Sequence, residues 1–315
     1  MPAHVPVLRR EVCELLDPRP GETVVDATVG EGGHALALAA RIGRDGCLVG
    51  LDADPASLAA ARQRLQDLPC RVELVHANFA EIARVLSALS VGGADVLLAD
   101  LGLSSAQLDD PRRGFSFREE GPLDMRMDPR LSAGAVDLVN RMKERELSDL
   151  LYYNAQEMAS RRIAKRICSA RREGRITTTT ELADIVAEAV GVDPSSRKAK
   201  IHPATRTFMA LRMAVNDEIP CLESFLALGP EVLRPGGRIG VIAFHSLEDK
   251  PVKNDFRKRK AEGVYRILTK KPIIAGAEER RTNPRSRSAK LRVAQRLPGE
   301  EWPGPIRDPA SAGRT

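Results

Sequence analysis

A run of glycines and two acidic residues near the N-terminus have the types and spacing of a small-ligand site. Gly30, Gly32 and Ala35 fit the pattern G-x-G-x-x-G/A, and Asp52 follows about 20 residues after Gly30. Glycines let the backbone turn sharply and approach a ligand closely, and an acid in the position of Asp52 can hold ribose hydroxyls. This pattern predicts a site for an adenosine-containing ligand.

Asp26, shortly before Gly30, indicates which ligand the turn would hold. An acid in the turn can pair with a ligand ammonium group, whereas it would repel the pyrophosphate of a dinucleotide. S-adenosylmethionine carries an ammonium group and NAD does not, so the sequence favours S-adenosylmethionine. NAD remains the alternative ligand, and a turn that only packs a helix on a strand remains the alternative to any ligand.

Asp100 and His245 follow two other predicted strands, at the edge where a ligand of such a sheet binds. Asp100 could orient the ligand or accept a proton from an amine under attack, or it could simply cap the next element. His245 could be a general base or contact the substrate RNA, although a histidine bonded to the backbone is the more common outcome.

A loop rich in aromatic and basic residues follows Asp100. Phe115 or Phe117 could stack on a flipped base, with Arg118 or Arg126 on a phosphate. Buried anchoring of the loop is an equally good explanation of its aromatic residues.

Further basic residues are candidates for phosphate contacts. Arg206 and Arg212 lie on different faces of one predicted helix, so we expect at most one of them to face the site. Arg285 and Arg287 lie in a polar, turn-like segment within 250–296, which holds 16 Lys and Arg against 4 Asp and Glu. This concentration of charge favours RNA as the partner over a merely solvated loop.

Composition limits the remaining possibilities. The chain has 315 residues, a net charge of +6 and only 3% aromatic residues, so stacking platforms for nucleic acid must be few. The five cysteines are scattered, and we expect neither a metal site nor disulfides. With no apparent signal peptide or membrane span, the sequence predicts a soluble, cytoplasmic protein.

Strands and helices alternate in the first hundred residues. This rhythm predicts βαβ units and a parallel sheet, hence a Rossmann-like α/β fold. The apolar runs predict strands over 23–25, 48–52, 72–79 and 96–100, and helices over 34–40, 56–68 and 82–89.

The rhythm then breaks. The next convincing strand is 238–244, although a crossover needs only a few tens of residues. Helical patterns fill the gap at 144–153, 157–172, 180–190 and 203–215. We therefore expect a discontinuous core, 1–104 and 217–297, with an inserted helical substrate domain, 105–216, placed over the ligand. The Pro-, Gly- and Ala-rich residues 298–315 predict a disordered tail.

Taken together, these segments resemble the MraW family of methyltransferases. The resemblance extends in family order to about Arg296. The motifs that carry it are Gly30-Glu31-Gly32-Gly33-His34, Asp100-Leu101-Gly102-Leu103-Ser104-Ser105, Arg113-Gly114-Phe115-Ser116-Phe117, Gly121-Pro122-Leu123-Asp124-Met125-Arg126-Met127, His202-Pro203-Ala204-Thr205-Arg206-Thr207-Phe208, Phe244-His245-Ser246-Leu247-Glu248-Asp249 and Asn283-Pro284-Arg285.

The resemblance implies a class I methyltransferase core that transfers a methyl group from S-adenosylmethionine to the exocyclic N4 of a cytidine in the decoding region of 16S rRNA. It implies 16S rRNA within the small ribosomal subunit as the partner, and no protein partner is predicted. It also implies a set of cofactor residues in the first turn, on the ribose, beside the adenine and near the methionine end: Gly32, Gly33, His34, Asp52, Phe79, Asp100 and Gln107.

The chain departs from the family pattern in two places. The family commonly has Tyr-Gly-Glu-Glu where this chain has Tyr153-Asn154-Ala155-Gln156-Glu157, and Pro251 stands where the family continues a helix. Both places lie outside the implied cofactor residues, so they concern RNA docking rather than the reaction.

Asp100 is the candidate catalytic residue. Cytosine N4 is a poor nucleophile because its lone pair is delocalised into the ring, so the site must localise that pair by accepting the N–H hydrogens. Asp100 and the backbone carbonyls of 102–105 are the candidate acceptors. The usual amino-methyltransferase signature, Asp or Asn followed by two prolines and an aromatic, is absent from the chain. An NAD-dependent oxidoreductase and a non-catalytic RNA-binding assembly factor are the alternative functions.

Overall fold

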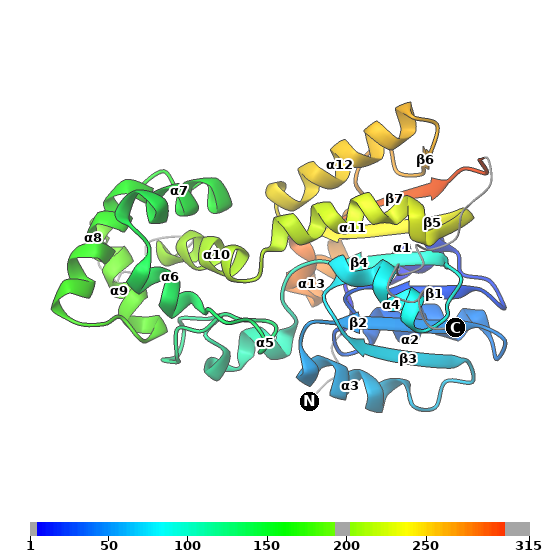
Figure 1. The fold of residues 1–315 in the computed structure, drawn as a ribbon, viewed down its shortest axis with the longest axis horizontal. Coiled ribbons are helices and arrows are strands. Elements are labelled where there is room, and N and C mark those ends of the chain that lie inside the picture. Colours follow the sequence, from blue (N-terminus) through cyan, green and yellow to red (C-terminus); the bar gives the residue numbers. More distant parts are fainter. Residues whose placement is uncertain (1–4, 193–201, 300–315) are drawn as a thin grey trace, which may run out of the picture. The chain divides into compact units, whose positions relative to one another are not determined.

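The computed structural model of the chain describes residues 5–192 and 202–299. It divides into two compact units, Met1–Gly102 with Ile219–Thr315, and Leu103–Glu218. We call them the sheet unit and the helical unit (Figure 1). Most of the tail predicted to be disordered, from residue 300 onward, lies outside the described residues.

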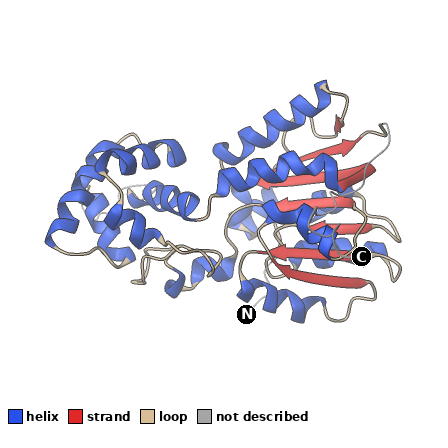
Figure 2. Cartoon of the chain, in the orientation of Figure 1, coloured by secondary structure: helices blue, strands red, loops and turns tan. Residues whose placement is uncertain are grey.

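The sheet unit is built on one seven-stranded sheet with the strand order β3-β2-β1-β4-β5-β7-β6 (Figure 2). The neighbours from β3 to β5 pair in parallel, whereas β7 pairs antiparallel with both β5 and β6. The predicted α/β class with a mostly parallel sheet is therefore confirmed. The strands are β1 (Thr23–Asp26), β2 (Cys47–Asp52), β3 (Arg71–His76), β4 (Ala94–Asp100), β5 (Leu233–Ala243), β6 (Tyr265–Ile267) and β7 (Lys290–Arg296).

One predicted strand is too long. The strand expected over 72–79 ends at His76, because Asn78 begins a short 3-10 helix, η1 (Phe79–Glu81). Asn78 Oδ1 accepts a hydrogen bond from Ala80 N, and Glu81 Oε2 accepts one from Asn78 N, which is the reciprocal arrangement of a capping box. Phe79 therefore lies on a turn beyond the strand rather than in it.

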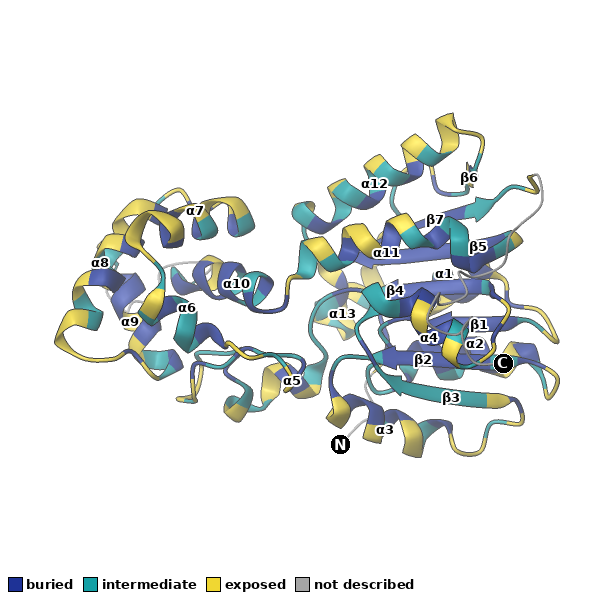
Figure 3. Ribbon diagram, in the orientation of Figure 1, coloured by how far each residue is buried: buried dark blue, intermediate teal, exposed yellow. Residues whose placement is uncertain are grey.

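Helices cover both faces of the sheet. Neighbouring residues of a strand point to opposite faces, so Val25 and Leu97 belong to one hydrophobic cluster while Val24 and Leu98 belong to another. Helices α4, α11 and α12 contribute to the first cluster, and α1, α2 and α3 to the second (Figure 3). The helices of this unit are α1 (Arg9–Leu16), α2 (Gly33–Ile42), α3 (Pro55–Leu65), α4 (Ile82–Ala88), α11 (Glu218–Val232, whose first residue belongs to the helical unit), α12 (Ser246–Ala261), α13 (Ala277–Thr282) and the 3-10 helix η3 (Pro284–Arg287).

The strand register brings three acids to one edge of the sheet. Asp26, Asp52 and Asp100 are the last residues of β1, β2 and β4, and β1 lies between the other two strands. Asp26 pairs with Gly50 on one side and Leu98 on the other, so β2 and β4 each extend two residues beyond it. The acids therefore surround the turn that leaves β1.

The helical unit has a separate hydrophobic core, which includes Leu147, Ile163, Ile167 and Leu211. The helix predicted over 157–172 begins later, at Ser160, because Gln156 ends the preceding helix in the left-handed region and a short loop follows. The helices of this unit are α5 (Ser105–Asp109), the 3-10 helix η2 (Pro111–Arg113), α6 (Ala135–Arg141), α7 (Glu144–Ala155), α8 (Ser160–Glu173), α9 (Thr179–Val190) and α10 (Ala204–Val215). None of the helices within residues 5–192 and 202–299 combines the length and the apolar character needed to cross a membrane.

Candidate active site

The turn between β1 and α2 is held in a conformation that requires glycine. Gly30 and Gly32 have φ angles of 51° and 81°, in the left-handed region that side chains disfavour. The backbone N–H of Gly30 donates to Asp52 Oδ2 at 2.8 Å, and that of Gly32 donates to the carbonyl of Val29 at 2.8 Å. The turn is thus fixed by β2 before any ligand binds.

Asp26 is a buried carboxyl group at the base of this turn, with 1% of its surface exposed. Its Oδ1 accepts a hydrogen bond from Thr28 N at 3.3 Å, while its Oδ2 has no hydrogen-bond partner in the described structure. Burial raises the pKa of the Asp26 carboxyl to about 7, although the neighbouring His34 opposes the shift. An oxygen without a partner, buried in this way, fits a ligand that brings a positive charge or a donor.

Asp52, the residue predicted to bind the ribose, is the last residue of β2. Its two oxygens accept hydrogen bonds from the backbone N–H groups of Gly30 and Asp54, each at 2.8 Å. Burial raises the pKa of the Asp52 carboxyl to about 6, and these two hydrogen bonds oppose the shift. Since a carboxylate has about four acceptor positions, Asp52 can hold the turn and still accept from two hydroxyls.

Asp100 and His34 face each other across the turn. His34 Nε2 lies 3.6 Å from Asp100 Oδ2, which is too long for a hydrogen bond but close enough for electrostatic attraction. Both ring nitrogens of His34 and the Oδ1 of Asp100 are buried without hydrogen-bond partners in the described structure. Asp100 N donates to Thr28 Oγ1 at 2.6 Å, a positioning contact that the sequence analysis did not anticipate.

The two other predicted cofactor residues lie in different units. Phe79 is half-buried in the sheet unit, and its ring packs edge-on against Phe225 with the centroids 5.7 Å apart. Gln107 is buried in the helical unit, where it forms a capping box with Ser104 at the start of α5. Its side-chain oxygen accepts from Ser104 N at 3.0 Å, so this residue has a local structural role besides the predicted one.

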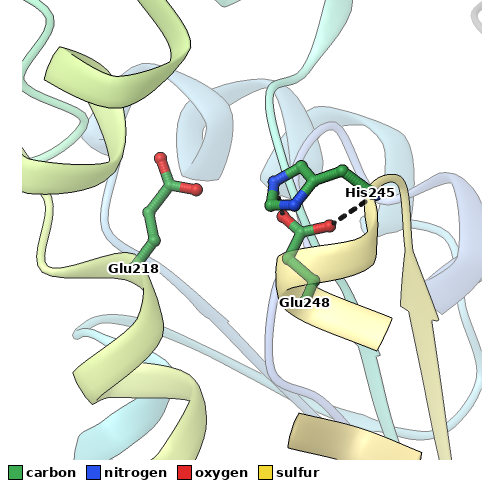
Figure 4. Close-up of side chains that lie close together, drawn as sticks. All are labelled: Glu218, His245 and Glu248. Atoms are coloured by element: carbon green, nitrogen blue, oxygen red, sulfur yellow. Dashed lines mark hydrogen bonds and ion pairs between the residues drawn. The ribbon is translucent and has the colours of Figure 1, made fainter. Parts of the chain in front are cut away.

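The ring of His245 does not bond to the backbone, the outcome that the prediction favoured, and neither of its nitrogens has a hydrogen-bond partner in the described structure. Its Nε2 lies 3.0 Å from Glu248 Oε1 (Figure 4). Glu248 Oε2 accepts a hydrogen bond from Phe244 N at 2.7 Å. Glu248 is 2% exposed and reaches back from the first turn of α12 to the end of β5. An acid three residues after the N-cap of a helix is the sequence signal that would have identified this partner. Figure 4 also draws Glu218, which belongs to the helical unit and pairs there with Arg212 at 2.7 Å.

Two residues predicted to contact RNA have structural roles in the helical unit. Phe115 is only 6% exposed and lies in the core of this unit, which favours the anchoring alternative over stacking on a base. The Arg126 guanidinium donates twice to the Asp124 carboxylate, at 2.7 and 2.8 Å, and once to the Leu131 carbonyl at 2.8 Å. This arginine fixes its own loop, and its contact with phosphate stays a prediction. Phe117 packs on Phe208 with the centroids 4.8 Å apart, as the anchoring alternative predicts.

The remaining candidates stay predictions. Arg118 and Arg206 are exposed on the helical unit, and Arg287 is exposed on the sheet unit, where its Nε donates to the Arg280 carbonyl at 3.3 Å. Arg285 is half-buried.

The chain is similar to proteins that are described as methylases. Residues 1–297 match the model of the MraW methylase family. A ribosomal RNA small subunit methyltransferase H of Sorangium cellulosum is 48% identical over 298 residues, which cover 95% of this chain and 92% of the relative. A protein of the same description from Acidobacterium capsulatum is 45% identical over 299 residues, covering 93% of this chain and 98% of the relative. Among solved structures, Aeropyrum pernix fibrillarin with natively bound S-adenosyl-L-methionine is 11% identical with a TM-score of 0.37, covering 91% of this chain and 74% of that chain.

Proposed function

Because this chain belongs to the MraW methylase family, and is therefore an S-adenosylmethionine-dependent methyltransferase of rRNA, we propose that it methylates the exocyclic N4 of a cytidine in the decoding region of 16S rRNA. The observation that carries the proposal is the group of polar atoms without partners around the glycine turn. Asp26 Oδ2, Asp100 Oδ1 and the ring nitrogens of His34 are all buried there. Buried polar atoms are nearly always paired in folded proteins, so these atoms support a site that a polar, cationic ligand completes.

The donor set fits the cofactor. When bound, S-adenosylmethionine supplies a methyl carbon made electrophilic by the positive sulfonium. Asp26 and Asp100 place carboxyl groups where an ammonium group can be held. Two opposite charges about 4 Å apart attract by about 1 kcal/mol in water and by about 4 kcal/mol near a protein surface. Asp52 is the proposed partner of the ribose hydroxyls and Phe79 the proposed contact of the adenine, while the turn at Gly32 and Gly33 allows close approach.

Asp100 is the proposed acceptor for the target amine. Its Oδ1 is free of hydrogen bonds in the described structure. Its backbone N–H donates to Thr28 Oγ1 at 2.6 Å, which fixes Asp100 at the end of β4. A carboxylate that accepts an N–H of cytosine N4 localises the amine lone pair and then takes the proton that the amine releases. His34, 3.6 Å from Asp100, is placed to stabilise the carboxylate in its charged form or to share that proton.

We propose 16S rRNA within the small ribosomal subunit as the partner, and the cytoplasm, where that RNA is found, as the location. Two relatives with the description ribosomal RNA small subunit methyltransferase H support this substrate. The excess of Lys and Arg over 250–296 supports a polyanionic partner in general.

The proposal is tested with S-adenosylmethionine that carries a labelled methyl group. The protein is incubated with naked 16S rRNA, small subunits and whole ribosomes, and digested RNA is analysed for N4-methylcytidine by mass spectrometry. Label in N4-methylcytidine at a single decoding-region position is the expected result. Label in another nucleoside, or none in all three substrates, would refute the proposal. Calorimetry with NAD should give no heat, which separates the methyltransferase from the oxidoreductase.

A further inference from the structure

Helix α8 of the helical unit carries a basic stripe that the fold does not use. Arg161, Arg162, Lys165 and Arg172 lie within about a third of its circumference, opposite the buried face that includes Ile163 and Ile167. Within the described residues, none of these four basic side chains makes an ion pair or a side-chain hydrogen bond.

The other arginines of α8 are accounted for by the fold. Arg166 donates to Glu188 at 2.7 Å, and Arg171 donates to the carbonyls of Val139 and Met142, each at 2.7 Å. Side chains of the same type on the same helix therefore divide into a group with structural partners and a group without them. The second group is the one that requires an explanation.

The position of Arg161 and Arg162 is unfavourable for the helix itself. Both lie in the first turn of α8, which contains no acid, so their charges oppose the positive end of the helix dipole. Glu157 just before the helix accepts from Ala159 N and offsets part of this cost. Arg161 and Lys165 are also like charges at i,i+4, which repel. Charges arranged against local stability are typical of a surface that serves a polyanionic partner.

Exposed apolar and aromatic side chains lie next to the basic turn. Tyr152, Tyr153 and Met158 are 46%, 70% and 79% exposed. The chain contains only three tyrosines, and the third, Tyr265, is 1% exposed. The Tyr152 and Tyr153 rings meet edge to face with the centroids 5.3 Å apart. Two of the few aromatic side chains in this chain are therefore exposed to water instead of packing in a core.

The helix packing brings the aromatic and basic groups together. Ser148 Oγ on α7 and Ser160 Oγ at the start of α8 form a buried hydrogen bond at 3.2 Å. Tyr152 lies one turn beyond Ser148 on the same face of α7, about 6 Å along the helix. The last turn of α7, which carries the tyrosines, is joined to the first turn of α8 by the short loop 156–159, which includes Met158.

We propose that Tyr152, Tyr153, Met158, Arg161, Arg162 and Lys165 form an RNA-docking surface, which we call the α7–α8 surface. The basic side chains contact phosphates of a single-stranded segment, and an unpaired base stacks on Tyr153. Charge complementarity to phosphate and an exposed π-face beside it are the two features that single-stranded RNA requires. The inference deepens the proposed function, since it names a surface that holds the RNA substrate.

The test measures the affinity of the full chain for a fluorescent transcript of the 16S decoding region by anisotropy, in about 0.1 M salt. The variants are Arg162→Glu and Tyr153→Ala. Their matched controls are Arg145→Glu, a charge reversal at an exposed position in the first turn of α7, and Ile274→Ala, an exposed apolar truncation on the sheet unit. We expect about tenfold weaker RNA binding for each variant and less than twofold for each control. Arg162→Glu should also make the dependence of affinity on salt less steep.

Two further readouts exclude misfolding and separate this inference from the proposed function. Arg162→Glu places an acid in the first turn of α8, so its unfolding temperature should be equal to or above that of the unchanged protein. The affinity for S-adenosylmethionine should be unchanged in all variants, and methyl transfer should show a raised KM for RNA with kcat retained.

RNA affinity that is the same in the variants and in the unchanged protein would overturn the α7–α8 surface, whatever nucleoside is methylated. Unchanged affinity for the transcript with reduced methylation of intact small subunits would also overturn it, because the surface would then contact a ribosomal protein. The proposed function fails by a different observation, the absence of N4-methylcytidine with the unchanged protein.

Discussion

The carboxylate of Asp52 holds the backbone N–H of Gly30 at 2.8 Å, so the acid that is the proposed ribose partner also fixes the glycine turn. One side chain thus links the end of β2 to the conformation of the loop after β1. Removal of this carboxylate should therefore affect the shape of the site as well as one contact in it.

We expect Asp52→Ala to weaken S-adenosylmethionine binding by about 10- to 100-fold or more, because hydrogen bonds to a charged group are each worth about 1.5 to 3 kcal/mol. Titration calorimetry measures the change. Asp45→Ala, on the loop before β2, is the matched control and should bind as the unchanged protein does. Equal affinities for Asp52→Ala and the control would show that the carboxylate does not contact the cofactor.

Asp26 should make the stability of the ligand-free protein depend on pH. Burial raises the pKa of its carboxyl from 3.8 to about 7, so the folded state favours the protonated form. The associated stability is fully present below about pH 4 and is lost as the pH rises to about 7. Asp26→Asn has no carboxyl group to titrate, so it should not lose this stability. Its free energy of unfolding minus that of the unchanged protein should therefore rise between pH 4 and pH 7, by up to about 4 kcal/mol.

Urea denaturation at pH 5 and pH 8 checks this prediction, with Asp17→Asn as an exposed control that should show no comparable change. A constant difference between Asp26→Asn and the unchanged protein at both pH values would mean that Asp26 titrates normally.

Cofactor binding should release protons near pH 6.5. An ammonium group beside Asp26 favours the ionised carboxylate and so lowers its pKa in the complex. The affinity for S-adenosylmethionine should therefore rise with pH up to about pH 7. Calorimetry in two buffers of different ionisation enthalpy counts the protons, and Asp26→Asn should release fewer. The same proton count for both proteins would place the released proton elsewhere.

Variants of Asp100 and Thr28 distinguish a catalytic role of the Asp100 carboxylate from the positioning of Asp100 by Thr28. We expect Asp100→Ala to lower kcat by about 10²- to 10⁴-fold, the usual contribution of a general base. Thr28→Val removes the hydrogen bond that Asp100 N donates, so kcat should fall by about tenfold. Thr28→Ser should keep the kcat of the unchanged protein, because serine retains the hydroxyl group. Single-turnover methylation measures these rates. Full activity of Asp100→Ala would exclude the proposed role.

Most strands of the sheet were predicted correctly, because the pattern that identifies a strand lies in neighbouring residues of the sequence. Alternating apolar runs and helical patterns reveal strands such as Ala94–Asp100 without knowledge of distant contacts. The strand Tyr265–Ile267 was missed, since three residues are too short to show a period. The prediction for 72–79 failed at its end because the capping box of Asn78 and Glu81 depends on side-chain hydrogen bonds.

The site was predicted less well, because its contacts join distant residues. Phe115 has the type and setting of a stacking residue, yet packing within the helical unit buries it. Arg126 could be assigned to Asp124 only once the loop geometry was known. The proximity of His34 to Asp100 depends on the register of β1 and β4, which cannot be predicted from the sequence alone. Tyr152 and Tyr153 can be read from the sequence, but their exposure cannot be predicted from it.

The strand order has a consequence for the protein during its synthesis. β4 (Ala94–Asp100) pairs with β5 (Leu233–Ala243), and the whole helical unit lies between them in the chain. The ribosome therefore completes the helical unit before it makes the strand that covers the free edge of β4. An uncovered strand edge invites pairing with other chains, so the nascent protein is most exposed to aggregation in that interval, and early folding of the helical unit cannot shorten it.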